Sequence, residues 1–499
     1  MLRVLGNPKR LCNGSTRRDL LRVGSLGALG AAIGGGLAGA RARASTSDLP
    51  GFGRAKSCIL LFLYGSPSQL ETFDPKPTAP EGIRGTLGKA ISTNVPGLDI
   101  AEGLPKMARV MDKVSLLRSV SHPYPIHGVA YALTGIPRID VAMELNPRDQ
   151  LHWPFLGSVV DYVERTKASD LPDVPRNVLL PWAFSSRRVG EVARAGPYAG
   201  FLGPAYDPIA VEFVGEGTKK AKKTLRDMVW EEPEPYRGVT PASRFRLSDA
   251  VGPDAGFVSV DRLHNRKSLL TQLEEARRDL DREAEASGID RHRAMAHSLL
   301  ASPKLRRAFS LEDEQSRDRE RYGMTLFGQA ALTARRLVEA GGRFISVFWD
   351  EYGLAGTGWD THWDHFPRMK DELLPGLDET LSALIADLDE RGMLDETLVL
   401  CLSEHGRTPI VTPGNGGGRD HWSRCYSALL AGGGIARGRV VGRSDKIASD
   451  PVERAVSPKD ILATAYHLLG IDPETVLIDR QGRPMPLVPD GRVIPEILA

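Results

Sequence analysis

Three short segments in the last third of the chain place carboxylates beside imidazoles. They are Gly358 to His365, Glu404 to Arg407 and Gly418 to Trp422. Four of the 11 histidines lie between residues 362 and 421, each within two residues of an aspartate or glutamate. Imidazole and carboxylate groups bind divalent cations, and a carboxylate can also orient a neighbouring imidazole. One such histidine is more often a hydrogen-bonded structural residue, but three groups together predict a metal or anion site.

Two arginines stand among these groups. Arg407 follows the Glu404 segment directly, and Arg419 lies beside Asp420. A guanidinium group matches the tetrahedral oxygens of phosphate or sulfate, so both side chains are candidates for anion binding. Arg407 is the candidate catalytic residue, because it could neutralise charge that develops on an anionic group. A surface ion pair with neighbouring carboxylates is the alternative at each position.

Five apolar runs have the length and the near-continuous hydrophobicity of buried parallel strands. They are Ser57 to Tyr64, Lys113 to Val120, Arg343 to Trp349, Thr397 to Leu402 and Tyr426 to Ala431. Two of the chemical segments follow the third and fourth runs, and the last one precedes the fifth run. Open parallel sheets bind ligands beyond the carboxyl ends of their strands, so we expect an α/β fold that brings the segments together there.

Helical patterns fill much of the remaining sequence. Leucines and isoleucines between residues 366 and 391 recur at spacings of three and four, which predicts a helix in a right-handed βαβ crossover. Pro375 suggests that this helix begins near Leu374. A further helix is predicted from about Thr325 to Glu339. Charged sequence from about residue 204 to 322 predicts a helical insert that forms a cap or lid; helices that simply cover the sheet are the alternative.

Residues 1 to 44 have the features of an export leader. Paired arginines at 17 and 18 precede a Gly/Ala-rich apolar run and the sequence Ala42-Arg43-Ala44. This pattern predicts a twin-arginine signal, read by the twin-arginine translocation machinery and cleaved before Ser45. A plain secretory signal or an N-terminal anchor is the alternative, although the run is short for a span of about 20 residues. We expect a mature periplasmic or extracellular domain of residues 45 to 499 with no membrane span.

Charge and cysteine content narrow the function of the mature chain. The leader holds eight of the 65 basic and one of the 63 acidic residues, which leaves 57 basic and 62 acidic residues. A net charge near −5 gives no reason to expect nucleic-acid binding. Cys58, Cys401 and Cys425 lie in apolar runs without metal-ligand spacing and are expected to be buried thiols. An exported setting also allows one disulfide among them.

Several motifs together resemble the secreted bacterial family called domain of unknown function 1501, part of the alkaline phosphatase and sulfatase superfamily. They are Gly65 to Pro77, Leu117-Arg118-Ser119, Arg321-Tyr322-Gly323, Ala334 to Gly341, Trp359 to His362, Ser403-Glu404, Gly406 to Pro409 and Asp420-His421. Thr397 to Gly406 is also similar to the sulfatase strand that ends in Ser-Asp-His-Gly, where Asp and His hold a metal. Ser457 to Asp472 resembles a late sulfatase segment. The resemblance implies an alkaline-phosphatase-like three-layer α/β/α sandwich with a mostly parallel sheet.

The chain departs from the superfamily pattern at two ligand positions. Sulfatases place an aspartate at the end of their first strand, but Leu63 to Ser66 stands there, with Glu71 and Asp74 only in the following loop. The closer family usually has phenylalanine at the position of His405. The wider superfamily alone therefore supports His405 as a metal ligand.

The chain also lacks the sulfatase nucleophile in register. Sulfatases carry Cys or Ser nine residues before the Thr of a Leu-Thr-Gly helix end, and Thr134 places Pro125 at that position. The nearest polar residues include Ser119 and Ser121. We expect His122 and His127 to be further site residues, with structural roles in a loop and helix as the alternative. Hydrolysis would then need a water activated by a metal.

These features lead to two functional hypotheses. The first is an exported metal-dependent hydrolase of sulfate or phosphate esters that binds one or two ions of zinc, calcium, magnesium or manganese. Its expected ligands are Asp360, His362, Glu404, His405, Asp420 and His421. The second is a non-catalytic exported binding protein that retains the fold and uses the site to hold a structural metal or an anion.

Overall fold

The computed structural model describes residues 48 to 499 except 148, 150, 168 to 171, 190 to 193, 226 and 227, 248 to 301, 355 to 357 and 415. The predicted export leader therefore lies outside the described residues. Residues 248 to 301 of the predicted helical insert lie outside them as well.

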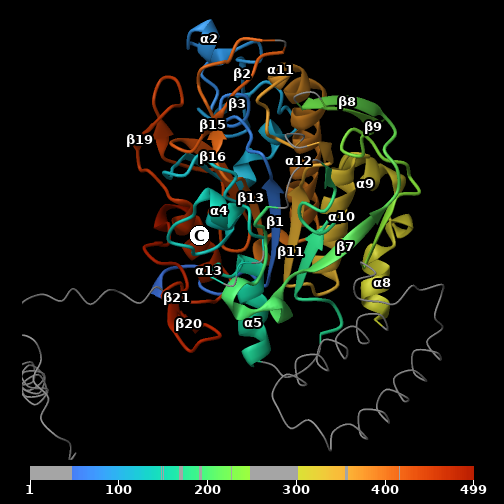
Figure 1. The fold of residues 1–499 in the computed structure, drawn as a ribbon, viewed down its shortest axis with the longest axis vertical. Helices are drawn as coiled ribbons and strands as arrows, with labels where there is room; N and C mark the ends of the chain where they lie inside the picture. The colour runs from blue at the N-terminus through green and yellow to red at the C-terminus, as the bar shows by residue number, and fades with distance from the viewer. Residues whose placement is uncertain are drawn as a thin grey trace, which may run out of the picture. The chain divides into compact units, whose positions relative to one another are not determined.

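A mixed sheet of nine strands forms the centre of the described chain (Figure 1). The strands follow the order β10 (Arg244–Leu247), β7 (Ile209–Val214), β5 (Asn177–Leu180), β11 (Phe344–Trp349), β1 (Ser57–Leu63), β13 (Thr397–Leu402), β16 (Tyr426–Ala431), β4 (Val114–Val120) and β17 (Arg439–Val441). Each of the five apolar runs predicted as a strand forms one. The predicted α/β fold is confirmed.

Strand direction decides which loops share an edge of the sheet. β1 runs parallel to both of its neighbours, with Cys58 opposite Phe344 of β11 and Ser57 opposite Thr397 of β13. The prediction of β16 as a further parallel strand is wrong, because β16 runs antiparallel to both β13 and β4. β4 therefore points the same way as β1, β11 and β13. Residues just before β16 consequently lie at the edge where these four strands end.

Helices cover both faces of the sheet. Side chains of β1 alternate between the faces, so residues 59, 61 and 63 join one buried core and residues 58, 60 and 62 join the other. The first core includes α10 (Leu326–Glu339) and α12 (Leu374–Glu390). The second includes α5 (Leu156–Lys167) and α13 (Pro458–Leu468). The result is a three-layer α/β/α sandwich (Figure 1), and burial on both faces explains why the strand sequences are continuously apolar.

The helix predicted between β11 and β13 is present but not uniform. It begins as α11 (His365–Arg368), passes through the π-helix η8 (Met369–Leu373) and continues as α12 from Leu374. Pro375 has no N–H to continue α-helical bonding, and the π-turn falls in the residues just before it. The segment α12 begins at Leu374 as predicted, but the helical stretch as a whole begins at His365. Across the described chain, no helix combines the length and the apolar content that crossing a membrane requires.

The helical insert predicted at residues 204 to 322 needs correction. Its first part forms β7 and β10, which extend the main sheet as an antiparallel pair, and the hairpin of β8 (Lys220–Leu225) and β9 (Met228–Pro233). The charges suggested helix, and of these four strands only β10, Arg-Phe-Arg-Leu, alternates polar and apolar residues with the strand period of two. Only α8 (Pro303–Phe309) and α9 (Ser316–Arg321) are α-helical among its described residues.

The cysteines form no disulfide within the described chain. Cys58, Cys401 and Cys425 are buried free thiols. Burial raises the pKa of both Cys401 and Cys425 to about 12. These thiols are therefore protonated and unreactive at neutral pH.

Candidate metal centre

The three chemical segments meet at the edge where β1, β4, β11 and β13 end. The short strand β14 (Gly406–Arg407), just after β13, pairs with β15 (His421–Trp422), just before β16. This pairing sets Arg407 opposite His421. The antiparallel course of β16 is what makes the pairing possible, because it starts the strand at the edge where β13 ends.

Gly65, two residues after β1, lies against two of these segments. Its N–H donates to Glu404 Oε1 at 2.8 Å. Its backbone has a φ of +94°, and a side-chain carbon at this position would lie 2.2 Å from the amide nitrogen of Asp360. Only glycine combines this conformation with this contact.

We expect Gly65→Ala to destabilise the fold by about 3 kcal/mol or more, because backbone strain and a clash with Asp360 act together. Gly97→Ala is the matched control, since Gly97 has a φ of +79° and no atom within 4 Å of the added carbon. The control should lose only about 1 to 2 kcal/mol. Urea unfolding measures both losses. Equal losses would mean that Asp360 moves away from the new methyl group at little cost.

Four histidines beside Asp360 share one arrangement of their ring nitrogens. Each Nδ1 lies against an oxygen: His127 against Glu404 at 3.0 Å, His362 against Asp420 at 2.7 Å, His405 against the Gly406 carbonyl at 2.8 Å and His421 against the Pro125 carbonyl at 3.2 Å. Donation of Nδ1–H to these oxygens leaves the four Nε2 atoms for other partners. Metal-binding histidines in proteins characteristically donate their second N–H to an oxygen, which fixes the ring and its tautomer.

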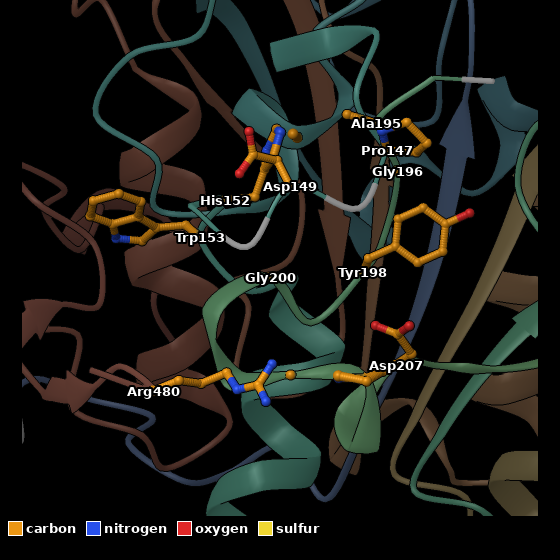
Figure 2. A pocket seen from close by; sticks show the side chains of 13 residues that line it. Pro147, Asp149, His152, Trp153, Ala195, Gly196, Tyr198, Gly200, Asp207 and Arg480 are labelled. Carbon is orange, nitrogen blue, oxygen red and sulfur yellow. The ribbon is translucent and has the colours of Figure 1, made fainter. Parts of the chain in front are cut away.

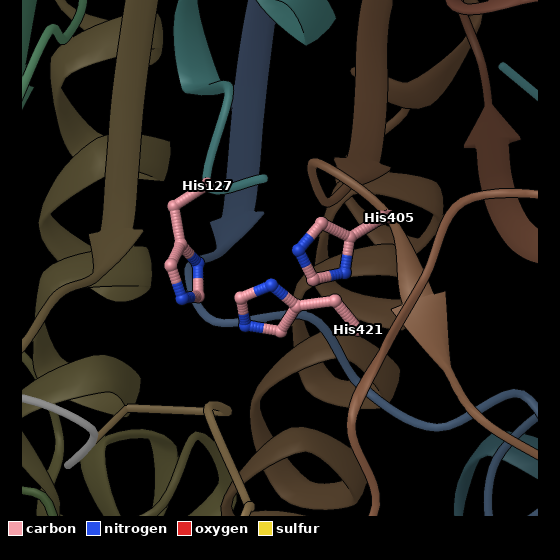
Figure 3. A group of neighbouring side chains, drawn as sticks. All are labelled: His127, His405 and His421. Atoms are coloured by element: carbon pink, nitrogen blue, oxygen red, sulfur yellow. The ribbon is translucent and has the colours of Figure 1, made fainter. Parts of the chain in front are cut away.

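Three of the four Nε2 atoms lie close to the Asp360 carboxylate. Asp360 Oδ1 lies 3.1 Å from His362 Nε2 and 3.4 Å from His421 Nε2, and Oδ2 lies 3.3 Å from His127 Nε2. Two overlapping groups have ligand atoms within 4.8 Å of one another: His127, His405 and His421 (Figure 3), and Asp360, His362 and His421. His421 belongs to both groups. The spacing fits a metal centre.

Two of the buried side-chain atoms without a hydrogen-bond partner in the described structure belong to neighbouring residues of this site. They are His405 Nε2 and Glu404 Oε2. With Nδ1–H donated to a carbonyl, His405 Nε2 carries a lone pair, and burying an unpaired acceptor costs about 1 to 3 kcal/mol. A cation held with His127 and His421 would satisfy this nitrogen. The donor set therefore fits a divalent cation.

The charges of the cluster are strongly coupled. Burial alone would raise the pKa of Asp360, but Arg407, His127 and His362 hold it well below its usual range. Burial alone would lower the pKa of His127, but Asp360 and Glu404 raise it to about 10. Burial lowers the pKa of His405 and, together with its neighbours, that of His421. At neutral pH the cluster thus holds an ionised Asp360, a protonated His127 and two neutral imidazoles.

Arg407 is buried behind Asp360. Its Nε donates to the Ser66 carbonyl at 3.1 Å, Nη1 to the Arg419 carbonyl at 3.1 Å, and Nη2 to Asp360 and the Gly65 carbonyl. The guanidinium therefore balances the charge of Asp360 and joins three site segments. A direct contact of Arg407 with a substrate anion stays a prediction.

The remaining predicted residues take supporting positions. Glu404 uses Oε1 to bind the Gly65 N–H and His127 Nδ1, so it orients an imidazole. Asp420 orients a second imidazole, because its Oδ1 contacts His362 Nδ1. His122 points its Nε2 to the Glu404 carbonyl at 2.7 Å, and burial lowers its pKa to about 4. The sequence motifs found these residues, but only the structure separates the orienting residues from the inner cluster.

A second buried cluster went unrecognised in the sequence. Arg419 donates to Glu71 Oε1 at 2.6 Å, and His365 Nε2 lies 3.2 Å from Glu71 Oε2. All three side chains are buried. His365 Nδ1 also contacts the Thr361 hydroxyl at 2.7 Å, beside Asp360 in the chain. Glu71 stands in the family motif Gly65 to Pro77. The presence of a carboxylate in this motif was the sequence feature that could have indicated a second charged cluster.

A well-formed cavity lies apart from these clusters. It has a volume of about 240 Å³, and its lining includes His152, Trp153, Tyr198, Asp207 and Arg480 (Figure 2). None of the inner cluster residues lines it. The lining residue nearest in sequence to the metal cluster is Ala130, which lies in α3 (Val129–Leu133), three residues after His127.

Solved structures with similar folds include two hydrolases and a synthase. The PsFucS1 sulfatase from Pseudoalteromonas sp. is 13% identical, with 97% of this chain and 76% of that chain covered and a TM-score of 0.37. The phosphonate monoester hydrolase SpPMH from Silicibacter pomeroyi is 13% identical, with 88% and 76% covered and a TM-score of 0.30. The lipoteichoic acid synthase LtaP from Listeria monocytogenes is 9% identical, with 91% and 80% covered and a TM-score of 0.32. Similarity at this level supports no statement about the activity of the present chain.

Family membership rests on the sequence itself. No curated protein matches the chain significantly. One family model matches residues 55 to 498, nearly the whole of the predicted mature domain. The chain therefore belongs to the family described as Protein of unknown function (DUF1501).

Proposed function

We propose that the chain is an exported metal-dependent hydrolase of sulfate or phosphate esters. The observation that carries the proposal is the common arrangement of four imidazoles, each with Nδ1 against an oxygen. The Nε2 atoms of His127, His362 and His421 lie within 3.4 Å of Asp360, and His405 Nε2 is buried without a partner. One or two cations would be held by His127, His405 and His421 and by Asp360, His362 and His421, two groups that share His421. An imidazole-rich set favours zinc or another transition metal over calcium and magnesium.

A bound cation would supply an activated water and charge stabilisation for ester hydrolysis. The chain's own residues prepare the site for this chemistry. Glu404 and Asp420 hold His127 and His362 in their tautomers, and Arg407 keeps Asp360 ionised. Pro125, which stands where sulfatases carry their nucleophile, contributes its carbonyl to orient His421. The proposal therefore assigns the attack to water.

Pro125 also favours the second candidate function, a binding protein that retains the site without turnover. A cation surrounded completely by protein ligands would then be structural, whereas a catalytic ion keeps an open position. The two functions share a metal centre and differ in chemistry. One experiment therefore has to measure both metal content and hydrolysis.

The test uses purified residues 45 to 499. Metal content is measured before and after incubation with zinc, calcium, magnesium or manganese, and 4-nitrophenyl sulfate and 4-nitrophenyl phosphate are assayed. Near-stoichiometric metal with turnover that a chelator removes would support the hydrolase. Stoichiometric metal without turnover of either ester class would favour the binding protein. A chain that takes up none of the four metals would contradict the metal centre itself.

Cation binding should strengthen as pH rises. The pKa of His127 is raised to about 10, so this imidazole is protonated at neutral pH and a cation has to displace its proton. The association constant should rise by about tenfold per unit between pH 6 and 8, with about one proton released per ion. Calorimetric titration with zinc in buffers of different ionisation enthalpy measures both quantities. His127→Gln should remove most of the slope; a slope that persists in this variant would place the displaced proton elsewhere.

A further inference from the structure

The cluster is open to solvent on one side. The Asp420 side chain is 62% exposed and the His362 side chain is 24% exposed. Glu404, which contacts His127, is completely buried, and His127 and His405 are buried as well. A substrate therefore reaches the cluster past His362 and Asp420.

Trp363 stands at this opening. It follows His362 in the chain, its ring centroid lies 5.5 Å from the His362 ring, and the planes meet at 51°. The residue is 57% exposed, whereas Trp349 and Trp359 in the neighbouring elements are completely buried. Exposed apolar area is unfavourable in water, and a tryptophan gains more than other side chains when a second ring covers its face.

The backbone on both sides holds Trp363 in place. On one side the Arg419 N–H donates to the Thr361 carbonyl at 3.1 Å. On the other side Asp364 adopts a left-handed conformation with a φ of +50°, and the His365 N–H donates to the Gly417 carbonyl at 3.0 Å. Non-glycine residues with positive φ concentrate at functional sites. Trp363 is thus presented from a fixed backbone, as a binding residue needs to be.

We infer that Trp363 is a substrate platform, on which a ring in the alcohol part of the ester stacks while its anionic group lies at the metal centre. The inference rests on the proposed function and narrows it to esters of ring-bearing alcohols. This stacking contact needs no charged group. Trp363 should therefore favour esters whose alcohol part carries a ring, and its replacement should leave the binding of a ring-free anion unchanged.

The test compares two anions that differ only in the ring. Phenyl phosphate and inorganic phosphate are titrated into metal-loaded wild type, Trp363→Ala and Trp363→Phe. The matched control is Phe52→Ala, because Phe52 is also an exposed aromatic residue, at 40%, but precedes β1 and lies at the other edge of the sheet. We expect Trp363→Ala to weaken phenyl phosphate binding by about 3- to 10-fold. Inorganic phosphate should bind unchanged, Trp363→Phe should retain most of the affinity, and Phe52→Ala should match the wild type.

The outcomes separate the platform from the metal centre. If both anions bind the wild type but Trp363→Ala changes neither affinity, the platform is overturned and the proposed function stands. Equal weakening of both anions would also overturn it, because Trp363 would then act through the metal centre. If neither anion binds the metal-loaded wild type, the anion site of the proposed function fails and the platform fails with it.

Discussion

Asp360→Asn is expected to lower cation affinity by about 100-fold or more, the largest effect of any single change at the site. Removal of a residue that only orients a ligand typically costs 10- to 100-fold in metal affinity. Asp360 is a candidate ligand itself, so its replacement should cost at least the upper end of this range. Its oxygens lie within 3.4 Å of His127, His362 and His421. Asparagine keeps the shape of the side chain but removes the charge that the cation would neutralise. Metal analysis after dialysis against a weak chelator measures the loss.

The same change has a smaller effect on stability. Arg407 loses its ionised partner, but it keeps three backbone carbonyls as acceptors and the amide oxygen of asparagine as a fourth. We expect a loss of about 1 to 3 kcal/mol, visible as a lower thermal midpoint. Asp364→Asn is the control, since Asp364 lies in the same loop with an exposed side chain. If Asp360→Asn has a normal unfolding transition and still retains stoichiometric metal, Asp360 is not a metal ligand.

Glu71→Gln is expected to destabilise the protein by about 3 kcal/mol at pH 7 without touching the metal cluster directly. Glu71 and Arg419 are completely buried and lie 2.6 Å apart. Neutralising one member of a buried ion pair leaves the other charge uncompensated, which typically costs about 3 to 5 kcal/mol. The glutamine can still accept a hydrogen bond from Arg419, which places the expected loss at the lower end of this range.

The loss should depend on pH in a defined direction. Burial alone would raise the pKa of Glu71, but Arg419 and His365 lower it from 4.5 to about 2. The carboxylate thus contributes stability that is fully present above about pH 4.5 and is lost as the pH falls towards 2. The difference in unfolding free energy between wild type and variant should shrink from about 3 kcal/mol at pH 7 to about half of that at pH 3.

Urea unfolding at pH 7, 5 and 3 measures this difference. Glu81→Gln is the control, because Glu81 lies nearby in the chain on an exposed four-residue helix, α2 (Glu81–Arg84). It should be neutral within about 0.5 kcal/mol at every pH. A constant difference between wild type and Glu71→Gln from pH 7 to pH 3 would show that folding leaves the pKa of Glu71 unchanged.

Local sequence predicts the strands because their burial is uniform. Ser57 to Leu63 and Thr397 to Leu402 are buried at every residue, so no surface residue interrupts the pattern. The direction of β16 has no comparable local signal, since an antiparallel central strand buried on both faces has the same composition as a parallel one. The segment from residue 209 to 247 was predicted to be helical for another reason: it is rich in charged residues, and only β10 among its short strands alternates charged with apolar residues.

The candidate site could be predicted in composition but not in organisation. Residues such as Asp360 and His362 stand out because carboxylates and imidazoles are costly to bury without a partner. The sequence could not show that Arg407 turns inwards to Asp360, or that Pro125 supplies a carbonyl to His421. Both contacts depend on strand pairing between distant segments. Backbone carbonyls also carry no residue-specific signal, so their role as orienting groups emerges only from coordinates.

The hydrogen bond between Gly65 and Glu404 joins residues 339 positions apart in the chain. Contacts of such range require closure of a very long loop, so they form late in folding, after the local helices and hairpins. A chain released before Glu404 would contain His127 and Asp360 but not His405 or His421, and so could not complete the cluster. If the proposed cation binds, a newly made chain could therefore load it only after synthesis has passed His421 and the two ends of this long loop have met.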